Sequence, residues 1–338
     1  MKVEHWGNSA MTSPYHEGEV ALQERSGGRL KAEAGGRGIQ DYIPPGAQEF
    51  LAQLPFVVLG AVDEQGEVWA THLVGAPGFA RARGDHTVVI NGGILQGDPL
   101  AEILRKVGSP VGIIGIEPSS RRRIRVNGRI EAIDGDVLTI STAEVFANCP
   151  KYIQARNFAP SARRETGEIR RSSHLEDCQR GWIESADTFY IATVHADRGV
   201  DCSHRGGMPG FVQIRDDHRL SFPDYSGNFM FQTLGNLELD SRAGLVFTDY
   251  QSGTLVHLSG NARVDFTDER RAEFERAERV VDFEVKSVIE RPGVLPLADT
   301  FVDYSRFNPG APADLEARQS DTGAWIRSIG GCSPEPNA

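Results

Sequence analysis

The sequence predicts a mainly β fold, with two similar antiparallel barrels in tandem and a few short helices. Pro77-Gly78-Phe79 recurs as Pro209-Gly210-Phe211, a separation of 132 positions (209 − 77), and Gly128 recurs at the same separation as Gly260. Between these marks, short apolar runs alternate with turn residues, which is typical of antiparallel strands. Two copies at this spacing indicate a duplicated domain. The two halves are therefore predicted to form a pseudo-dimer, with a cleft between them, inside one chain.

Composition is that of an ordinary folded protein. The 338 residues suffice for about two domains, and 25% charged with 39% hydrophobic residues is usual for such chains. The net charge of −11 argues against a nucleic-acid partner. No apolar run approaches the roughly 18 to 20 residues that cross a bilayer, and the N-terminus lacks the apolar core of a signal peptide, so we expect no membrane association.

The cysteines give no sign of a metal or disulfide framework. Their spacing contains no Cys-x-x-Cys pair; the four are Cys149, Cys178, Cys202 and Cys332. His16-Glu17-Gly18-Glu19 is not a His-Glu-x-x-His zinc motif. We therefore expect no metal and a cytoplasmic location.

The first copy is predicted to consist of hairpin strands and one short helix. Its expected strands are Phe56 to Val62, Val68 to Val74, Thr87 to Asn91, Val111 to Ile116 and Ile124 to Ile130. Asp63-Glu64-Gln65-Gly66 and Gly84-Asp85 supply turns. Asp98 to Val107 predicts the helix, because Asp98 and Pro99 suit its first turn.

The second copy repeats this order. Its expected strands are Phe189 to His195, Phe211 to Arg215, Arg219 to Phe222, Ala243 to Asp249 and Thr254 to Val264. A helix is expected near Phe229 to Leu239. A charged helix from Glu269 to Arg279 and a closing strand from Val280 to Ile289 complete it.

Five segments are expected along the chain. Residues 1–45 form a polar N-terminal arm whose glycine-rich stretch, 27–38, is predicted to be a mobile linker. Residues 46–158 form the first barrel, and 159–181 a charged connector. Residues 182–308 form the second barrel with its closing helix and strand, and 309–338 a loose C-terminal tail.

A phosphate-binding site is predicted in the second copy. Cys202 to Phe211 places an imidazole, a guanidinium and paired glycines at a junction between strands, and Phe222 to Asn228 joins a strand to the following helix. Ser226, Gly227 and Asn228 would supply hydrogen-bond donors beside the positive end of that helix dipole. The start of such a helix can bind one phosphate group.

Five segments carry a resemblance to a known family. They are Ser203-His204-Arg205-Gly206-Gly207 with Pro209-Gly210-Phe211, Pro223-Asp224-Tyr225-Ser226-Gly227-Asn228, Leu258-Ser259-Gly260-Asn261-Ala262, Arg123 to Arg129, and Asn148 to Ile153. In order and spacing, over roughly residues 45 to 295, they resemble the FMN-binding split-barrel proteins similar to pyridoxamine 5′-phosphate oxidase, in particular the flavin-nucleotide-binding proteins. Each segment alone is weak, whereas the set is fairly specific.

The resemblance implies an FMN site in a groove between two split barrels. The cofactor-binding residues it implies are Ser203, His204, Arg205, Phe211, Pro223, Asp224, Tyr225, Ser226, Asn228, Lys151 and Arg125. Ser226 and Asn228 fall where the family has a phosphate-contacting serine and lysine. Because asparagine replaces the lysine, the missing charge must come from elsewhere, and Arg205 and Lys151 are the candidates.

The two copies differ at the corresponding positions. The second reads Gly227-Asn228 where the first reads Gly97-Asp98, and a carboxylate there would repel phosphate. Arg125 of the first copy corresponds to His257 of the second. One flavin site is therefore expected, with most contacts from the second barrel.

Structural roles compete with these assignments. His204 and Arg205 could cap a hairpin and pair with Asp201 or Asp224. The Arg121 to Arg125 cluster could be a solvated hairpin tip, although Arg123 and Arg125 should share a strand face. Lys151-Tyr152 could be no more than a segment that seals a barrel. His86 and His218, both in Asp-His turns, are expected to be structural.

The function indicated is that of an FMN-dependent oxidoreductase acting on an unidentified small molecule, with no catalytic side chain identified. The alternative is a non-catalytic carrier of flavin or a related tetrapyrrole, and a third reading is an empty cleft used for protein association. Expected partners are a small-molecule substrate, an electron-donor protein or nicotinamide cofactor, and a second copy in a homodimer. Vitamin B6 oxidation is not expected, because Arg291 to Leu297 contains no Trp-Arg pair.

Overall fold

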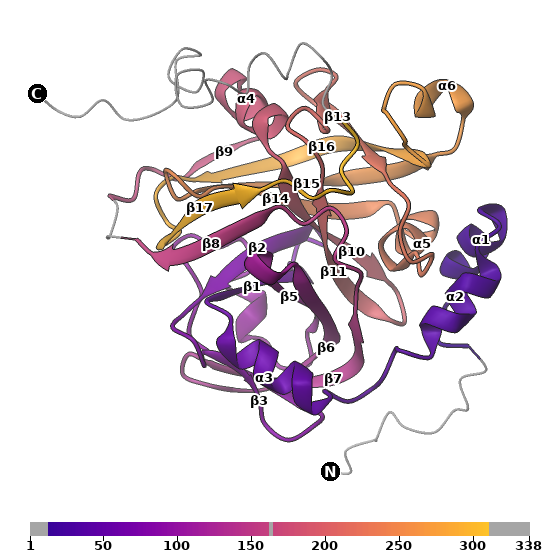
Figure 1. The fold of residues 1–338 in the computed structure, drawn as a ribbon. Helices are drawn as coiled ribbons and strands as arrows, with labels where there is room; N and C mark the ends of the chain where they lie inside the picture. The colour runs from indigo at the N-terminus through magenta and orange to yellow at the C-terminus, as the bar shows by residue number, and fades with distance from the viewer. Residues whose placement is uncertain (1–12, 162–164, 311–338) are drawn as a thin grey trace, which may run out of the picture.

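The computed structural model describes residues 13–161 and 165–310, and its two large sheets share one strand order (Figure 1). The first runs β2-β1-β5-β6-β7-β4-β3 and the second β11-β10-β14-β15-β16-β13-β12, with β9 beside β16. A small third sheet pairs β17 with β8. Each strand of the first sheet thus has a counterpart at the same place in the second. The prediction of a mainly β fold with two similar bodies is confirmed.

The strands of the first sheet are β1 (Phe56–Val62), β2 (Val68–Val74), β3 (Ala80–Ala82), β4 (Thr87–Asn91), β5 (Pro110–Glu117), β6 (Arg122–Asp134) and β7 (Val137–Ala147). Those of the second are β9 (Arg170–Ser172), β10 (Thr188–His195), β11 (Gly199–Gly206), β12 (Gln213–Ile214), β13 (Arg219–Asp224), β14 (Arg242–Asp249), β15 (Thr254–Asp265) and β16 (Arg279–Arg291). The third sheet has β8 (Ala155–Pro160) and β17 (Leu297–Asp303).

The repeated glycines serve the same purpose in both sheets. Gly128 sits at a register shift between β6 and β7, and Gly260 at a register shift between β15 and β16. A Cβ on either glycine would collide with a carbonyl oxygen of the neighbouring strand, from Ser141 and Glu284 respectively. Both positions therefore require glycine, because the backbone of a bulge approaches too closely for a side chain.

Contacts between the two sheets are reciprocal. Gly112 on β5 lies against the backbone of β11, and Gly244 on β14 lies against the backbone of β2. These glycines are 132 positions apart (244 − 112), so the same patch of each half packs on the other half. A self-complementary contact of this kind is the signature of a two-fold interface. Here it lies within one chain.

The space between the sheets is filled by buried apolar side chains from both halves. This interface core includes Phe56, Val58, Ala70, Ile114, Tyr190, Ala192, Val200 and Val246. Each sheet also has a core of its own on the other face. At about 25 cal/mol per Å² of buried apolar surface, the shared core binds the halves firmly together.

Six α-helices and two short 3-10 turns accompany the strands in the described part of the chain. The helices are α1 (Glu17–Arg25), α2 (Arg29–Gly36), α3 (Pro45–Gln53), α4 (Asp177–Ser185), α5 (Gln232–Leu239) and α6 (Asp268–Arg271), and the 3-10 turns are η1 (Ile103–Arg105) and η2 (Pro118–Ser120). Figure 1 shows α1 and α2 beside α5, whereas α3 lies near β3.

The N-terminal arm is not the mobile linker that its glycines suggested. The stretch 27–38 contains α2, and the buried Ala32 packs with Tyr15, Phe146 and Met230 in one cluster. The glycines are there for close approach: a Cβ on Gly36 would press on Pro14 and Tyr15. Packing in this cluster, against Phe146 of β7 and Met230 of the loop before α5, outweighs the weak helix propensity of glycine.

Several other local predictions were wrong. Only η1 forms within the expected helix from Asp98 to Val107, where the buried Asp98 carboxylate accepts from the Leu100 amide, Thr71 and Arg291. The charged helix expected from Glu269 is the four-residue α6. The strand expected from Phe211 to Arg215 is reduced to β12. The connector 159–181 contains β9 and the start of α4, and its bounds stay a prediction. Residues 311–338 of the predicted tail lie outside the described residues.

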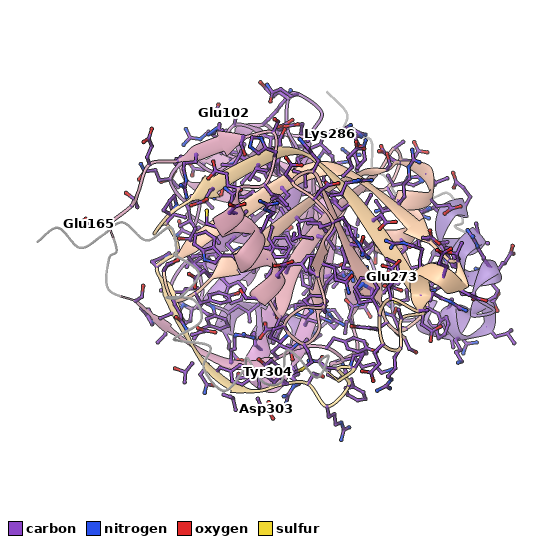
Figure 2. The ribbon with its side chains drawn as sticks, turned by 90° about the horizontal axis from the view of Figure 1, so that it is seen from above. Glu102, Glu165, Glu273, Lys286, Asp303 and Tyr304 are labelled. Carbon is purple, nitrogen blue, oxygen red and sulfur yellow. The ribbon has the colours of Figure 1, made fainter. Side chains whose placement is uncertain are left out.

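Charged side chains such as Glu102, Glu273 and Lys286 project from the outside of the molecule (Figure 2). None of the helices in the described ranges is long and apolar enough to cross a bilayer. The chain as a whole has a net charge of −11. Any concentration of positive charge inside the fold stands out against it.

Candidate functional site

A pocket opens between the two halves at one side of their interface. The first half contributes β6 and the segment 148–152, and the second half contributes the ends of β11 and β13, the loop before α5 and the start of β16. Its empty volume, counted together with the open mouth, is about 820 Å³. We call it the arginine pocket, after Arg123, Arg125, Arg205 and Arg279, which line it.

Three of the four guanidinium groups pair with two carboxylates, Asp224, which lines the pocket, and Asp201, which does not. Arg125 Nη1 lies 3.1 Å from both Asp201 oxygens. Arg205 Nη1 lies 2.6 Å from one carboxylate oxygen of Asp224, and Arg279 Nε lies 2.9 Å from the other. Arg123 has no carboxylate partner among the described residues. With Lys151, five positive side chains line the pocket against one lining carboxylate, and Asp201 compensates Arg125 from outside the lining.

The arginines also keep unused donors. The Nε atoms of Arg123, Arg125 and Arg205 are buried without a hydrogen-bond partner among the described residues, and so is Gln232 Nε2. Buried donors are nearly always satisfied in folded proteins. Unpaired donors together with surplus positive charge indicate a place for an anion with several acceptor oxygens.

His204 supports Arg123 and carries no charge. Its Nδ1 lies 3.2 Å from Arg123 Nη1, so Nδ1 accepts and the proton of the neutral ring is on Nε2. Burial, followed by the nearby Arg123, holds the pKa of His204 well below its usual value. Burial also lowers the pKa of Arg123 to about 10. At neutral pH the arginine is charged and the histidine is not.

Helix α5 points its start into the pocket. It begins at Gln232 without a side-chain cap, and Gln232, Thr233 and Leu234 line the wall. Just before it, Phe229 and Phe231 have φ values of 61° and 62°, in the left-handed region. Non-glycine residues there are uncommon and often mark functional sites. An uncapped helix start favours an anion.

Two tyrosines from different halves form the rim. The rings of Tyr152 and Tyr225 are 5.1 Å apart. The Tyr152 hydroxyl donates to the Ser226 carbonyl at 3.0 Å, and Lys151 Nζ donates to the same oxygen at 3.3 Å. The segment 151–152 thus joins the first half to the loop of the second, with aromatic faces beside the cationic wall.

Nine of the eleven residues predicted for the cofactor site line the pocket. They are Arg125, Lys151, His204, Arg205, Phe211, Pro223, Asp224, Tyr225 and Asn228. Ser203 lies behind the wall, fully buried, and its hydroxyl is 2.9 Å from that of Thr233. Ser226 contributes its carbonyl to the rim. Asn228 turns its amide to Met230, with Nδ2 3.0 Å from the sulfur, so it fixes the loop. Ligand contact by any of these residues stays a prediction.

Sequence reasoning missed Arg123, Arg279 and Gln232 as lining residues. A signal existed for Arg123, because it shares a strand face with Arg125. Arg279 had no local signal: it lies directly opposite Asp224 only after β13 and β16 have paired. Gln232 was hidden because the helix was expected to begin three residues earlier.

The corresponding place on the other side of the interface is closed. His257, the counterpart of Arg125, has Nδ1 2.9 Å from the Ala70 carbonyl and Nε2 3.2 Å from Arg291 Nη1. Arg291 pairs with Asp98 at 3.0 Å, and both side chains are fully buried. One guanidinium meets one carboxylate there. Surplus charge is therefore confined to the side predicted to hold the ligand.

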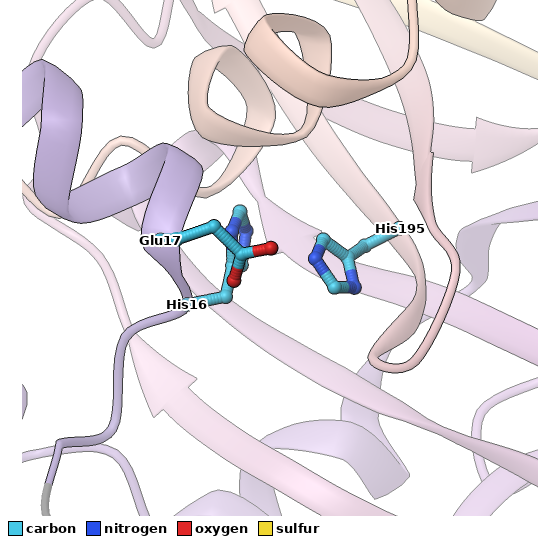
Figure 3. A group of neighbouring side chains, drawn as sticks. All are labelled: His16, Glu17 and His195. Carbon is cyan, nitrogen blue, oxygen red and sulfur yellow. The ribbon is translucent and has the colours of Figure 1, made fainter.

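A further cluster, His16, Glu17 and His195, brings three potential metal-binding groups within 4.8 Å of one another (Figure 3). His16 Nδ1 accepts from the Gly18 amide, and His195 Nδ1 accepts from the amides of Asp197 and Arg198. In both neutral rings the proton is then on Nε2. Neither ring offers a free lone pair, so this arrangement favours helix capping over metal binding.

Residues 175–295 match the family model described as "Pyridoxamine 5'-phosphate oxidase". This range is about a third of the chain and includes the second sheet from α4 to β16. The resemblance inferred from the motifs is thereby confirmed for that range. The match does not extend to the first half, and a comparison with curated proteins found none that matches.

Solved structures similar to this chain each cover about a third of it. An FAD binding protein from Mycobacterium smegmatis is 18% identical, with 36% of this chain and 99% of that one covered and a TM-score of 0.27. A conserved protein of unknown function from Corynebacterium diphtheriae is 17% identical, with 37% and 98% covered and a TM-score of 0.28. HupZ from Group A Streptococcus is 12% identical, with 39% and 98% covered and a TM-score of 0.28.

Proposed function

We propose that the arginine pocket binds the phosphate-bearing end of a flavin, FMN in the first instance, and that the protein is a flavin-dependent oxidoreductase acting on a small molecule. The observation that carries this proposal is that five positive side chains line the pocket against one lining carboxylate, Asp224, with Asp201 as a further counter-charge to Arg125, in a chain whose net charge is −11. The family match supports it, because the matched half supplies most of the pocket lining.

The residues present fit such a ligand. A phosphate needs several donors and compensating charge, which Arg205, Arg279 and the start of α5 offer on one wall. A planar ring system needs flat apolar surface, which Tyr152 and Tyr225 offer at the rim. Both features lie in one pocket.

A bound flavin would supply the electron or hydride transfer. The chain's own residues would bind, orient and compensate charge. Arg123 and Arg125 would favour negative charge on the ligand, because a buried guanidinium interacts strongly in a low-dielectric site. The His204 Nδ1 lone pair holds Arg123 in position, while its Nε2 proton stays on the ring at neutral pH.

A non-catalytic flavin carrier is the second candidate. It is favoured by the absence, among the described lining residues, of a carboxylate or imidazole free to exchange protons. Asp224 pairs with two arginines, and His204 Nδ1 accepts a hydrogen bond from one. Such a wall can hold a cofactor without acting on a substrate.

The test is to identify and assay the bound ligand. Freshly purified protein should release FMN on denaturation, detected by mass spectrometry, and should show flavin absorbance. Bleaching by NADH or NADPH followed by continued oxidation of the nicotinamide in air would favour the oxidoreductase. Stable colour without turnover would favour the carrier. Failure of apoprotein to take up FMN, FAD or riboflavin would refute flavin binding altogether.

A further inference from the structure

The loop that closes one end of the arginine pocket does not hold its shape alone. Phe229 and Phe231 are both in the left-handed backbone region, which costs of order 1 kcal/mol or more for each non-glycine residue. Such a conformation persists only where neighbouring structure imposes it. Asn228 and Arg279 supply part of this support, and the N-terminal arm supplies another part.

Three residues at the end of α1 and the start of α2 contact this loop and its arginine. Gln23 Nε2 donates to the Met230 carbonyl at 3.3 Å. Gly28 lies so close to the Phe229 ring that a Cβ would collide with it. Arg279 Nη1 donates to Ser26 Oγ at 3.0 Å. The arm thus touches the strained loop twice and a pocket arginine once.

The arm itself is anchored to the helix that lines the pocket. His16 caps α1 through Nδ1, and its Nε2 lies 3.0 Å from Asn236 Oδ1 on α5. A Cβ on Gly18 would collide with the Gly235 carbonyl, so the two helix backbones touch there. A series of contacts therefore runs from α5 to α1, and from there to the loop 228–231 and to Arg279.

We propose that the segment 16–36 is a working part of the site: it positions Arg279 and the loop 228–231 for an anionic ligand, and ligand binding in turn stabilises docking of this segment. Gln23, Ser26 and Gly28 are then positioning residues. Such coupling is reciprocal: if docking of this segment strengthens ligand binding by some factor, ligand binding strengthens docking by the same factor. The proposal rests on the proposed function only for the identity of the ligand.

Gly28→Ala is the sharpest variant. Gly28 has φ −99°, which alanine adopts without strain, so the added methyl acts only on the Phe229 ring. Gly46→Ala on α3 is the matched control, because nothing lies within 4 Å of its added methyl. Ser26→Ala, which removes only the hydroxyl that receives Arg279, is the milder second variant, with the exposed Glu24→Ala as its control.

Two readouts test the proposal. In FMN and riboflavin titrations, Ser26→Ala should weaken FMN binding about 5-fold, with little effect on riboflavin, which lacks the phosphate. Gly28→Ala should weaken FMN binding about 10-fold or more, and both controls should bind as the wild type does. In hydrogen exchange, the ligand-free Gly28→Ala protein should exchange faster at the amides of 229–234. FMN should slow exchange in residues 17–36 of the wild type.

The outcomes separate this proposal from flavin binding itself. If the wild type binds neither FMN nor inorganic phosphate, the proposed function fails, and exchange at 229–234 still decides whether the arm positions the loop. Wild-type affinity together with unchanged exchange in Gly28→Ala and Ser26→Ala would overturn the proposal. Equal losses of FMN and riboflavin binding in Ser26→Ala would also overturn it, because positioning of Arg279 predicts a phosphate-specific effect.

Discussion

Arg279 stands directly opposite Asp224 in the β13–β16 ladder, and its Nε lies 2.9 Å from Asp224 Oδ2. Asp224 Oδ1, the other carboxylate oxygen, pairs with Arg205 Nη1. One aspartate thus holds two arginines that are distant in sequence on the same wall. The arginine pocket depends on this shared counter-charge when no anion is bound.

Asp224→Asn should lower stability in an anion-dependent way. The substitution leaves Arg205 and Arg279 without a carboxylate, and breaking a buried ion pair costs about 3 kcal/mol or more. Melting temperature should fall in chloride buffer and recover partly with inorganic phosphate, because a ligand that binds only the folded state stabilises it. The exposed pair Asp268–Arg271 provides the control, Asp268→Asn, with a change below about 1 kcal/mol. A loss that phosphate does not relieve would contradict an anion site here.

Arg123→Gln should weaken flavin binding selectively. Arg123 has no carboxylate partner among the described residues, so its charge is the most available to a ligand. Loss of a charged hydrogen bond of about 1.5 to 3 kcal/mol predicts about 10-fold to 100-fold weaker FMN binding. Arg122→Gln is the matched control, since this neighbour is exposed and pairs with Glu117. Fluorescence titration measures both, and equal affinities for the two variants would refute the assignment.

Ligand stoichiometry should be one per chain despite the two similar halves. The counterpart site is filled by the fully buried Arg291–Asp98 pair and His257. Arg291→Leu should cost about 3 to 5 kcal/mol of stability, because it leaves Asp98 buried and unpaired, and the double variant with Asp98→Asn should recover most of it. Neither should alter the FMN content per chain. A second equivalent of FMN in the wild type would show that this side opens.

Glu19→Gln should stabilise the protein, increasingly so as pH rises. Burial raises the pKa of Glu19 from 4.5 to about 8, and the nearby Glu144 and Asp201 add to the rise. The folded state therefore binds the proton more tightly, so stability is complete below about pH 4.5 and is lost as pH rises towards 8. Glutamine removes that loss while its oxygen can still accept from the His16 amide.

The two melting curves should meet near pH 4.5 and differ by several degrees at pH 8. Arg198 and His16 also face Glu19. Burial lowers the pKa of His16 to about 4, which reduces stability below pH 6.5 in both proteins and cancels in the comparison. A constant difference across this pH range would contradict the assigned shift.

Sequence alone predicted the parts of the fold that obey local rules. Gly128 and Gly260 marked the register of the two halves, and both prove to sit at bulges that exclude a side chain. Arg125 and Lys151 were found through motifs of the first half. Strand alternation could have added Arg123, which was given to a solvated hairpin tip.

What the sequence could not predict depends on tertiary pairing. Arg279 faces the pocket only because β16 pairs with β13, 55 positions from Asp224 (279 − 224). The stretch 27–38 was taken for a linker, because its glycines resemble a flexible segment until the loop before α5 supplies the surface that Gly28 and Gly35 approach. The start of α5 was misplaced because Phe229 and Phe231 adopt a backbone conformation that phenylalanine rarely does.

The central claim is that the arginine pocket binds the phosphate of a flavin. The most direct measurement is titration of the apoprotein with FMN and with riboflavin, for the wild type and Arg123→Gln, at two salt concentrations. We expect one FMN per chain, tighter binding of FMN than of riboflavin, and an FMN preference that shrinks with added salt and in the variant. Equal affinity for the two flavins, unaffected by salt or by loss of the arginine, would contradict it.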